Sequence, residues 1–271
     1  MNSPTHQSWI NAAADNVVAG KPIENIRLSQ PDISTDNAYA LQRQLIQQLR
    51  ENQAWGGICG YKAALTAEVA QQAMGVHEPV IGVLFSYGAR SAQAEGSLGI
   101  DTDRPVLLET ELGFTLNQRI QDAVTPDTVK TMVSHCQGVI ELAAPNLQQR
   151  PSGVDLISSN SASYGFITAA ATHDPTSLAL DNLDVSLTRL EAGAGTEQPG
   201  GPELLHSFGA GTVMEGQWQA LAWLVNRVLE QGYELEPGHL LMTGSIGNMH
   251  PAKPGKYVAD FAALGQLTFH I

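Results

Sequence analysis

Apolar residues recur at helical spacing through the first third of the chain. The segment TDNAYALQRQLIQQLREN predicts a helix with one apolar stripe, formed by Ala38, Leu41, Leu45 and Leu49. Thr35 or Asp36 is a suitable N-cap for this helix. Further helices are expected over residues 5–19 and 67–74, and Gly75 is expected to end the second of them.

From residue 80 onward the period of the pattern shortens, which predicts strands. VIGVLF (80–85) is a continuous apolar run, and LLETELGFTL (107–116) alternates. Alternate residues of a strand share a face, so Glu109 and Glu111 lie on the same side of the second strand. Further strands are expected over residues 138–143, 163–169, 183–190, 240–247 and 266–271.

Two helices are expected between these strands. TPDTVKTMVSHC begins with Thr125 as N-cap and Pro126 at the first helical position. GQWQALAWLVNRVLEQG is amphipathic and ends at Gly232. Helices at the start followed by many strands predict an α+β fold: a helical N-terminal portion (1–79) and a largely β catalytic body (80–271), packed as one compact unit.

Composition narrows the class of protein. The chain has 271 residues, of which 43% are hydrophobic and 15% charged, and it carries a formal net charge of −13. An acidic, compact chain is not suited to nucleic acid or an anionic membrane, because both partners require a basic face. The first residues show no basic stretch followed by an apolar one, so no secretory signal is expected, and no apolar run approaches the roughly 18 residues that span a bilayer. A cytoplasmic protein with two reduced thiols, Cys59 and Cys136, is expected.

The carboxylates of Glu109 and Glu111 have two interpretations. They form either a solvated polar face or part of a divalent-cation site, because residues two apart on a strand lie roughly 6–7 Å from each other. Glu141, in the apolar run GVIELAAPN, is a third candidate ligand, since an isolated buried carboxylate is costly. Ligands that are all oxygen favour Mg²⁺, Ca²⁺ or Mn²⁺ over zinc.

Lys62, in CGYKAALT, is the candidate counter-charge for an acidic substrate. In a small apolar neighbourhood it could bind a carboxylate, or transfer a proton if burial lowers its pKa. A lysine that extends along the surface is the alternative. His77 and His135 are interpreted as surface or helix-end residues, and the Gly-rich stretch at 191–203 lacks the strand and helix of a dinucleotide site.

The order of these segments resembles a known family. GYKAALT, MGVHEPVIGVLF, the Glu109–Glu111 strand, the Glu141 strand, SNSASYGFI and ALAWLVNRVLEQGYELEPGHLLMTGS follow one another as in the 2-keto-4-pentenoate hydratase and 4-oxalocrotonate decarboxylase family. This family belongs to the fumarylacetoacetate hydrolase superfamily. The resemblance covers nearly the whole chain and depends on the joint order and spacing of short motifs.

The resemblance implies a fold, a metal site and a homo-oligomer. The fold is a mixed β-roll or sandwich body surrounded by helices, and the metal is Mg²⁺ or Mn²⁺ held by Glu109, Glu111 and Glu141. Lys62 matches the family's lysine and would act in catalysis and substrate binding. The small polar motif Thr243, Gly244 and Ser245 would also bind the substrate carboxylate.

Two segments depart from the family pattern. Where the family carries an Asp after a proline, this chain has Pro79-Val80-Ile81-Gly82. Where the family follows its third ligand with a V-D-S-R-like run, Glu141 is followed by Leu142-Ala143-Ala144-Pro145-Asn146. The metal ligands are therefore kept while two polar groups near them are lost.

The reaction implied by the resemblance is hydration of a short 2-hydroxydienoate or 2-oxo-enoate acid to a 4-hydroxy-2-oxo acid, as in the catabolism of aromatic compounds. Decarboxylation of a 2-oxo-enedioate proceeds through the same enolate and is the first alternative. Hydrolysis of a C–C bond in an acylpyruvate is the second, although no His–Glu dyad is evident. A non-catalytic member of the family is the third.

Overall fold

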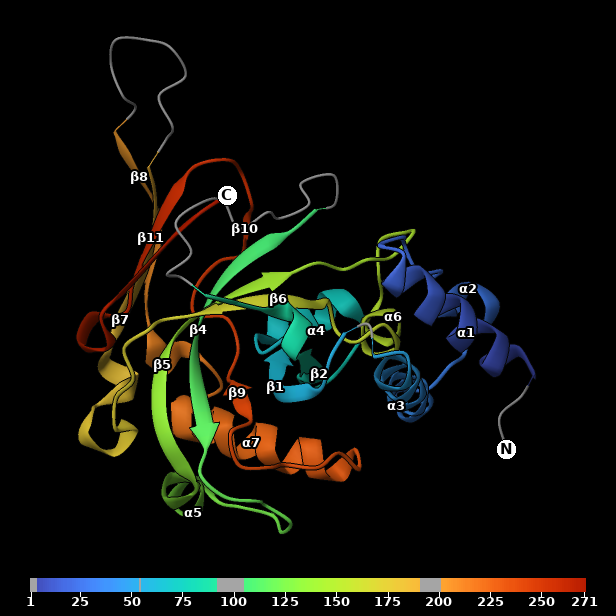
Figure 1. Cartoon of the computed structure of the whole chain (residues 1–271), viewed down its shortest axis with the longest axis horizontal. Helices are drawn as coiled ribbons and strands as arrows, with labels where there is room; N and C mark the ends of the chain where they lie inside the picture. Colours follow the sequence, from blue (N-terminus) through green and yellow to red (C-terminus); the bar gives the residue numbers. More distant parts are fainter. Residues whose placement is uncertain (1–3, 54, 92–104, 191–200) are drawn as a thin grey trace.

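The computed structural model describes residues 4–53, 55–91, 105–190 and 201–271. Within these ranges, two β-sheets form the body and helices flank them (Figure 1). The larger sheet has the strand order β2-β1-β9-β4-β5-β6-β3, with β10 beside β4, and the smaller has the order β12-β11-β7-β8. The predicted α+β class is confirmed.

The strands of the larger sheet are β1 (Ile58–Ala64), β2 (Val80–Phe85), β3 (Ala89–Ser91), β4 (Leu107–Leu116), β5 (Val133–Ala143), β6 (Ser163–Thr168), β9 (Leu240–Met242) and β10 (His250–Pro251). Those of the smaller sheet are β7 (Asp184–Leu190), β8 (Pro202–Gly209), β11 (Lys256–Asp260) and β12 (Gln266–His270). The α-helices are α1 (Pro4–Val18), α2 (Ile26–Ser29), α3 (Thr35–Glu51), α4 (Glu68–Met74), α5 (Pro126–Val129), α6 (Gly153–Ser158) and α7 (Gln217–Glu230).

Most of the helices fall into two groups beside the larger sheet. α1, α2, α3 and α6 form one group, and α7 packs against β1, β2 and β9 (Figure 1). The apolar stripe predicted for α3 is buried, as are the inward residues of α7. Gly75 and Gly232 adopt the left-handed conformation that ends α4 and α7, with φ angles of 71° and 74°.

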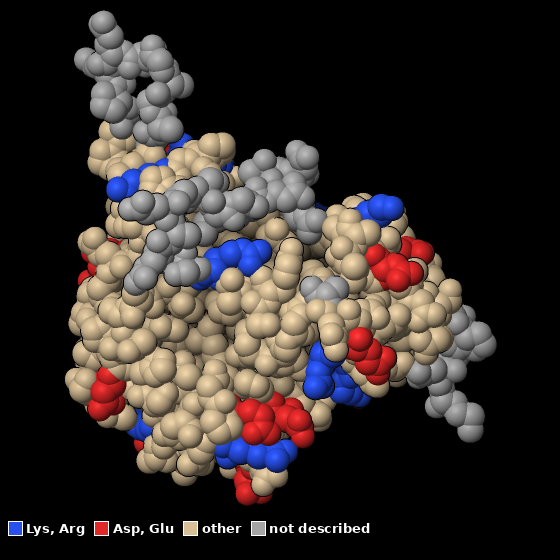
Figure 2. All heavy atoms as spheres, in the orientation of Figure 1, with Lys and Arg blue, Asp and Glu red and all other residues tan. Residues whose placement is uncertain are grey.

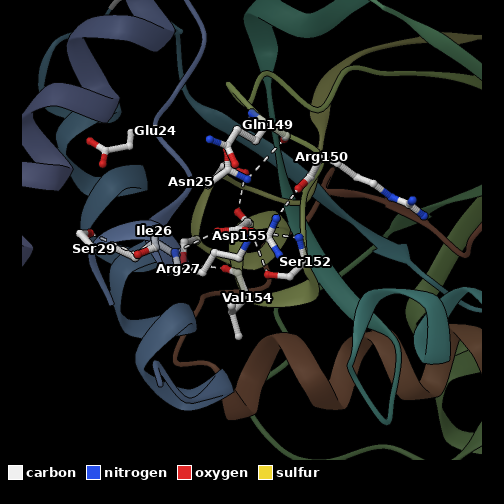
Figure 3. Close-up of polar contacts among 12 residues, drawn as sticks. Glu24, Asn25, Ile26, Arg27, Ser29, Gln149, Arg150, Ser152, Val154 and Asp155 are labelled. Atoms are coloured by element: carbon white, nitrogen blue, oxygen red, sulfur yellow. Dashed lines mark hydrogen bonds and ion pairs between the residues drawn. The ribbon is translucent and has the colours of Figure 1, made fainter. Parts of the chain in front are cut away.

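A buried carboxylate joins the first helices to the body. Asp155, at the start of α6, accepts hydrogen bonds from the Ser152 backbone and hydroxyl and from the Arg27 backbone, and it pairs with the Arg27 guanidinium at 3.1 Å (Figure 3). The side chain of Asn25 contacts both the backbone N–H and the carbonyl of Gln149. These contacts fix α2 against α6, which forms one wall of the cavity described below.

Several predicted elements need correction. The helix expected from Pro126 is only one turn long; a 3₁₀ turn follows, and Val133, a β-branched residue, begins β5. The N-cap of α3 is Ser34, whose hydroxyl accepts from the Asn37 N–H, and not Thr35 or Asp36. The strand expected over 240–247 ends at Met242.

One strand precedes the predicted division at residue 79. β1 pairs antiparallel with β2 and parallel with β9, so part of the first 79 residues belongs to the larger sheet. The division into two portions stays a prediction. Residues 92–104, expected from the sequence as part of a polar connection between strands, lie outside the described residues, as do residues 191–200, which make up most of the Gly-rich stretch at 191–203.

The charged side chains are sparse on the face drawn in Figure 2. Lys and Arg are scattered there, several of them beside Asp or Glu, and form no continuous basic stripe on the part of that face that is described. None of the described helices combines the length and the apolar character that a bilayer crossing needs.

Candidate metal centre

The pairing of β4 with β5 brings three carboxylates together. Glu109 lies directly opposite Glu141 in the antiparallel ladder, and Glu111 follows two residues later on the same face of β4. Oxygen atoms of the three side chains lie within 4.8 Å of one another. The sequence predicted the shared face of Glu109 and Glu111, and the ladder adds the third carboxylate.

The cluster is buried and contains one cation. Glu111 and Glu141 are 0% and 1% exposed, and Glu109 is partly exposed. Lys62, on β1, is 2% exposed, and its Nζ lies 2.7 Å from Glu141 Oε1. Gly82, on β2, leaves room for this side chain, since a Cβ there would lie 3.0 Å from Lys62 Cε. The interpretation of Lys62 as a surface lysine is therefore wrong.

The remaining oxygens of the cluster are suited to a cation. Glu111 Oε1 and Glu141 Oε2 are buried and accept no hydrogen bond from any described residue. Three carboxylates face one ammonium, so a divalent cation would balance the charge of the ionised cluster. Buried charges require such compensation, and an all-oxygen donor set favours Mg²⁺, Ca²⁺ or Mn²⁺. The residues present therefore fit a hard divalent ion.

The crowding of like charges shows in the pKa values. Burial, followed by repulsion from Glu141, raises the pKa of Glu109 to about 7. The same two causes, with Glu109 added, raise the pKa of Glu111 well above its usual value. Burial alone would lower the pKa of Lys62, but the charges of Glu141, Glu109 and Glu111 outweigh it and raise the pKa.

The loop after β9 supplies the small polar motif. The Gly244 N–H donates to Glu111 Oε2 at 2.7 Å, and the Thr243 hydroxyl contacts Gln217 Oε1 at 2.7 Å. Gly244 has a φ of 112°, and a Cβ there would lie 2.5 Å from Thr66, so both conformation and space require glycine. The substrate-binding role predicted for this motif stays a prediction.

Of that motif, Ser245 is the residue that borders a cavity. The cavity has a volume of about 360 Å³ and is also lined by Lys62 and Glu109. Ser245 Oγ is buried without a hydrogen bond of ordinary geometry to a described residue, although its proximity helps to lower the pKa of Glu109 against the larger effect of burial. Thr243 and Gly244 lie behind it, where they hold the loop and Glu111.

The opposite face of β4 carries a hydrogen-bonded chain that the sequence did not predict. Thr110 donates its hydroxyl hydrogen to the Ile246 carbonyl at 2.7 Å and lies 3.0 Å from His206 Nε2. Because a hydroxyl has one hydrogen, His206 Nε2–H must donate to Thr110, and His206 Nδ1 then accepts from His250 Nε2 at 2.9 Å. This chain joins the two sheets and holds the loop that carries Gly244 and Ser245.

Known proteins resemble the chain in both sequence and fold. It is 29% identical over 243 residues to 2-keto-4-pentenoate hydratase of Paraburkholderia xenovorans, which covers 88% of this chain and 83% of the relative. It is 25% identical to 2-oxo-hept-4-ene-1,7-dioate hydratase of Escherichia coli, in an alignment that covers 91% of this chain and 90% of the relative. No family model matches the chain.

Solved structures give the fold. 4-Oxalocrotonate decarboxylase from Pseudomonas putida G7, complexed with magnesium and adipate, superposes with a TM-score of 0.84 at 18% identity over 100% of this chain and 98% of that one. A fumarylacetoacetate hydrolase family protein from Yersinia pestis superposes with a TM-score of 0.58 at 13% identity, covering 78% of this chain and 91% of that one.

The fold is therefore that of the fumarylacetoacetate hydrolase superfamily, with a buried carboxylate cluster that can hold a metal ion. In sequence, the chain is similar over most of its length to 2-keto-4-pentenoate hydratases and, at lower identity, to a 4-oxalocrotonate decarboxylase. The resemblance predicted from the sequence is confirmed.

Proposed function

We propose that the chain is a divalent-metal-dependent hydratase that adds water to a short 2-hydroxydienoate or 2-oxo-enoate acid. The observation that carries this proposal is the cluster of Glu109, Glu111 and Glu141, which has unpaired buried oxygens and lies next to Lys62 at one end of a cavity. The names of the sequence relatives, most of them hydratases of 2-oxo or 2-hydroxy acids, support the choice of reaction.

The cluster would hold Mg²⁺ or Mn²⁺. When bound, such an ion supplies Lewis-acid polarisation of the 2-oxo oxygen and of the neighbouring carboxylate. Gly244 fixes the orientation of Glu111 through the backbone hydrogen bond to Oε2. Lys62 is held in place by Glu141 and lines the cavity, where its positive charge stabilises the acid and the negative charge that develops on the enol oxygen.

The reaction balances as two proton transfers and one addition of water. The 2-hydroxydienoate loses the proton of its 2-hydroxyl group and gains one at carbon 5, which gives a conjugated 2-oxo-enoate. Water then adds its oxygen to carbon 4, and a proton is taken up at carbon 3. The Ser245 hydroxyl, which borders the cavity, would hydrogen-bond the substrate carboxylate or the entering water.

The alternative reactions have weaker support. Decarboxylation is supported by the fold shared with 4-oxalocrotonate decarboxylase and by one sequence relative of that name, but the relatives of higher identity are named hydratases. Hydrolysis of an acylpyruvate requires a base to activate water, and no histidine is among the described residues that line the cavity. The homo-oligomer implied by the family is also a proposal.

Turnover of 2-hydroxypenta-2,4-dienoate, followed by the loss of its ultraviolet absorbance and by identification of the product, tests the function. We expect 4-hydroxy-2-oxopentanoate to form in the presence of Mg²⁺ or Mn²⁺ and turnover to stop when a chelator is added. Release of carbon dioxide from a 2-oxo-enedioate without hydration of any dienoate would overturn the proposal in favour of the decarboxylase.

A further inference from the structure

The cavity beside the carboxylates is polar at one end and apolar along its length. Lys62, Glu109 and Ser245 form the polar end. The rest of the described lining is mostly apolar and comes from α4, β4, β5, α6 and the loop after β9; it includes Val69, Met74, Leu107, Pro151, Leu156 and Met249. Lys62 is the one cation in that described lining, and it is already paired with Glu141.

The register of β4 and β5 gives the direction in which a substrate extends. Glu109 is paired with Glu141, and the next pair on the same face is Leu107 with Ala143. Two residues along a strand correspond to roughly 6.6 Å, so this apolar pair lies one step beyond the carboxylates. A 2-oxo acid anchored at the carboxylates therefore places the carbon atoms beyond its double bonds over Leu107 and Ala143.

The mouth of the cavity is largely apolar, with the uncharged Asn248 as an exposed polar residue beside Met249. Val69, on α4, is 75% exposed, and Met249 is 55% exposed, yet both line the cavity. Large apolar side chains that are exposed to water at the rim of an apolar cavity indicate a binding site for an apolar group of a ligand. A second carboxylate placed there would lose water without gaining a described cationic partner, which is costly.

The volume leaves room for more than a five-carbon acid. Sites for drug-sized ligands are typically about 300–1,000 Å³, and this cavity has about 360 Å³. A short dienoate alone would leave the Leu107 and Leu156 end filled only by water, which gives poor contacts with apolar walls.

From this geometry we propose that the substrate carries one carboxylate and an uncharged alkyl or aryl tail, and that the enzyme discriminates against substrates with a carboxylate at the far end. The inference rests on the proposed function for the anchoring of the 2-oxo acid end. Leu107, Leu156, Val69 and Met249 act as specificity determinants, because they contact the tail and not the reacting atoms.

A matched pair of substrates tests the discrimination. 2-Hydroxyhepta-2,4-dienoate and 2-hydroxyhepta-2,4-diene-1,7-dioate have the same carbon chain and differ in the group at carbon 7. We expect kcat/KM for the monoacid to exceed that for the diacid by at least about tenfold. Equal or greater kcat/KM for the diacid would overturn the inference and leave the hydratase function intact.

Variants at the mouth of the cavity test whether its residues determine the preference for the monoacid. Met249→Arg adds a cation where the diacid's second carboxylate would lie, and we expect it to reduce the monoacid preference by about tenfold, whereas the uncharged Met249→Gln should reduce it much less. Leu204→Arg, at a 63% exposed position on β8 outside the cavity lining, makes the same charge change and should leave the preference unaltered. Val69→Arg serves as the second charged variant if Met249→Arg does not fold.

A binding measurement separates this inference from the proposed function. Calorimetry with Mg²⁺ compares 2-oxoheptanoate with 2-oxoheptanedioate, neither of which has a double bond to hydrate. Tighter binding of the monoacid in a protein that hydrates neither dienoate would support the inference and overturn the hydratase. Equal binding, tighter binding of the diacid or binding of neither acid would overturn the inference.

Discussion

The two faces of β4 differ in whether their buried polar groups have hydrogen-bond partners. On one face Thr110, 0% exposed, has its hydroxyl bonded to the Ile246 carbonyl and to His206. On the other face Glu111, also 0% exposed, has one oxygen bonded to the Gly244 N–H and the other without a described hydrogen-bond donor. The first face is complete within the protein, and the second requires something from outside.

This difference separates structure from function along a single strand. Buried polar groups are nearly always paired, so an unpaired carboxylate oxygen in a well-packed sheet indicates a ligand. The paired face should govern stability, and the unpaired face should govern metal binding and turnover. Substitutions on the two faces can therefore be compared directly.

The largest effect is expected for Glu111→Gln. This change keeps the shape and the bond to Gly244 but removes a charge from the metal site, and the loss of several kcal/mol of transition-state stabilisation corresponds to about 10²–10³-fold in kcat/KM. Because it also removes repulsion among buried carboxylates, thermal unfolding without added metal should occur at the same or a higher temperature. A variant with near-normal turnover, or one that unfolds much earlier, would contradict the assignment of this face to function.

Lys62→Met should affect both activity and stability. Removal of one partner of a buried ion pair leaves Glu141 uncompensated, which costs about 3 kcal/mol in similar cases. Added Mg²⁺ returns positive charge to the cluster, so the Mg²⁺-dependent rise in melting temperature should be larger in this variant than in the native protein. An equal rise in melting temperature in both proteins would show that the charge of Lys62 does not influence metal binding.

Thr110→Val tests the paired face. The variant preserves volume but leaves the Ile246 carbonyl and the His206 N–H unpaired, at a cost of about 1–3 kcal/mol in the free energy of unfolding measured with denaturant. Metal affinity should remain within a few-fold of the native value. A loss of metal binding comparable to that of Glu111→Gln would show that the two faces are not separable.

The paired face should also show a pH dependence, which grows gradually as the pH falls. Burial, then the charge of His250, lowers the pKa of His206 from 6.5 to about 4. The unfolded chain takes up this proton as the pH falls below about 6.5, whereas the folded chain does so only near 4, so stability should fall between these values. The loss is at most about 3–4 kcal/mol, because the pKa is lowered by about 2.5 units at about 1.4 kcal/mol for each unit.

The control for this dependence is His206→Gln, which has no proton to bind in that range. The free energy of unfolding is measured with denaturant at pH 7 and pH 5 for the native protein and for the variant. For each protein, the value at pH 5 is subtracted from the value at pH 7. The difference should be smaller for the variant, although His250, whose pKa burial also lowers, contributes in the same direction. Equal differences for the two proteins would show that His206 does not cause the pH dependence of stability.

The sequence predicted the acidic residues better than their surroundings. The alternation in LLETELGFTL placed Glu109 and Glu111 on one face, and the apolar context of Glu141 indicated an unusual carboxylate. Lys62 entered as a candidate although β1, the strand that carries it, was not predicted. Lys62 lies in the short run GYKAA, where its four neighbours are small or apolar. The spacing of apolar residues in so short a run does not distinguish a strand from a helix.

The features that the sequence did not predict depend on contacts between distant residues. Thr110, His206 and His250 come from three separate strands, and each looks like an ordinary polar residue in its own segment. The apolar cavity wall combines α4, α6 and the loop after β9, and no motif marks such a combination. Local pattern gives elements and faces, whereas the pairing of β4 with β5 decides which side chains meet.

Titration of the metal-free protein with Mn²⁺, followed by calorimetry and electron paramagnetic resonance, is the most direct test of the metal site. We expect one ion to bind per chain, binding to be lost in Glu111→Ala and Glu141→Ala, and binding to be retained in Thr110→Val. Mn²⁺ binding with unchanged stoichiometry and affinity in both glutamate variants would contradict the account.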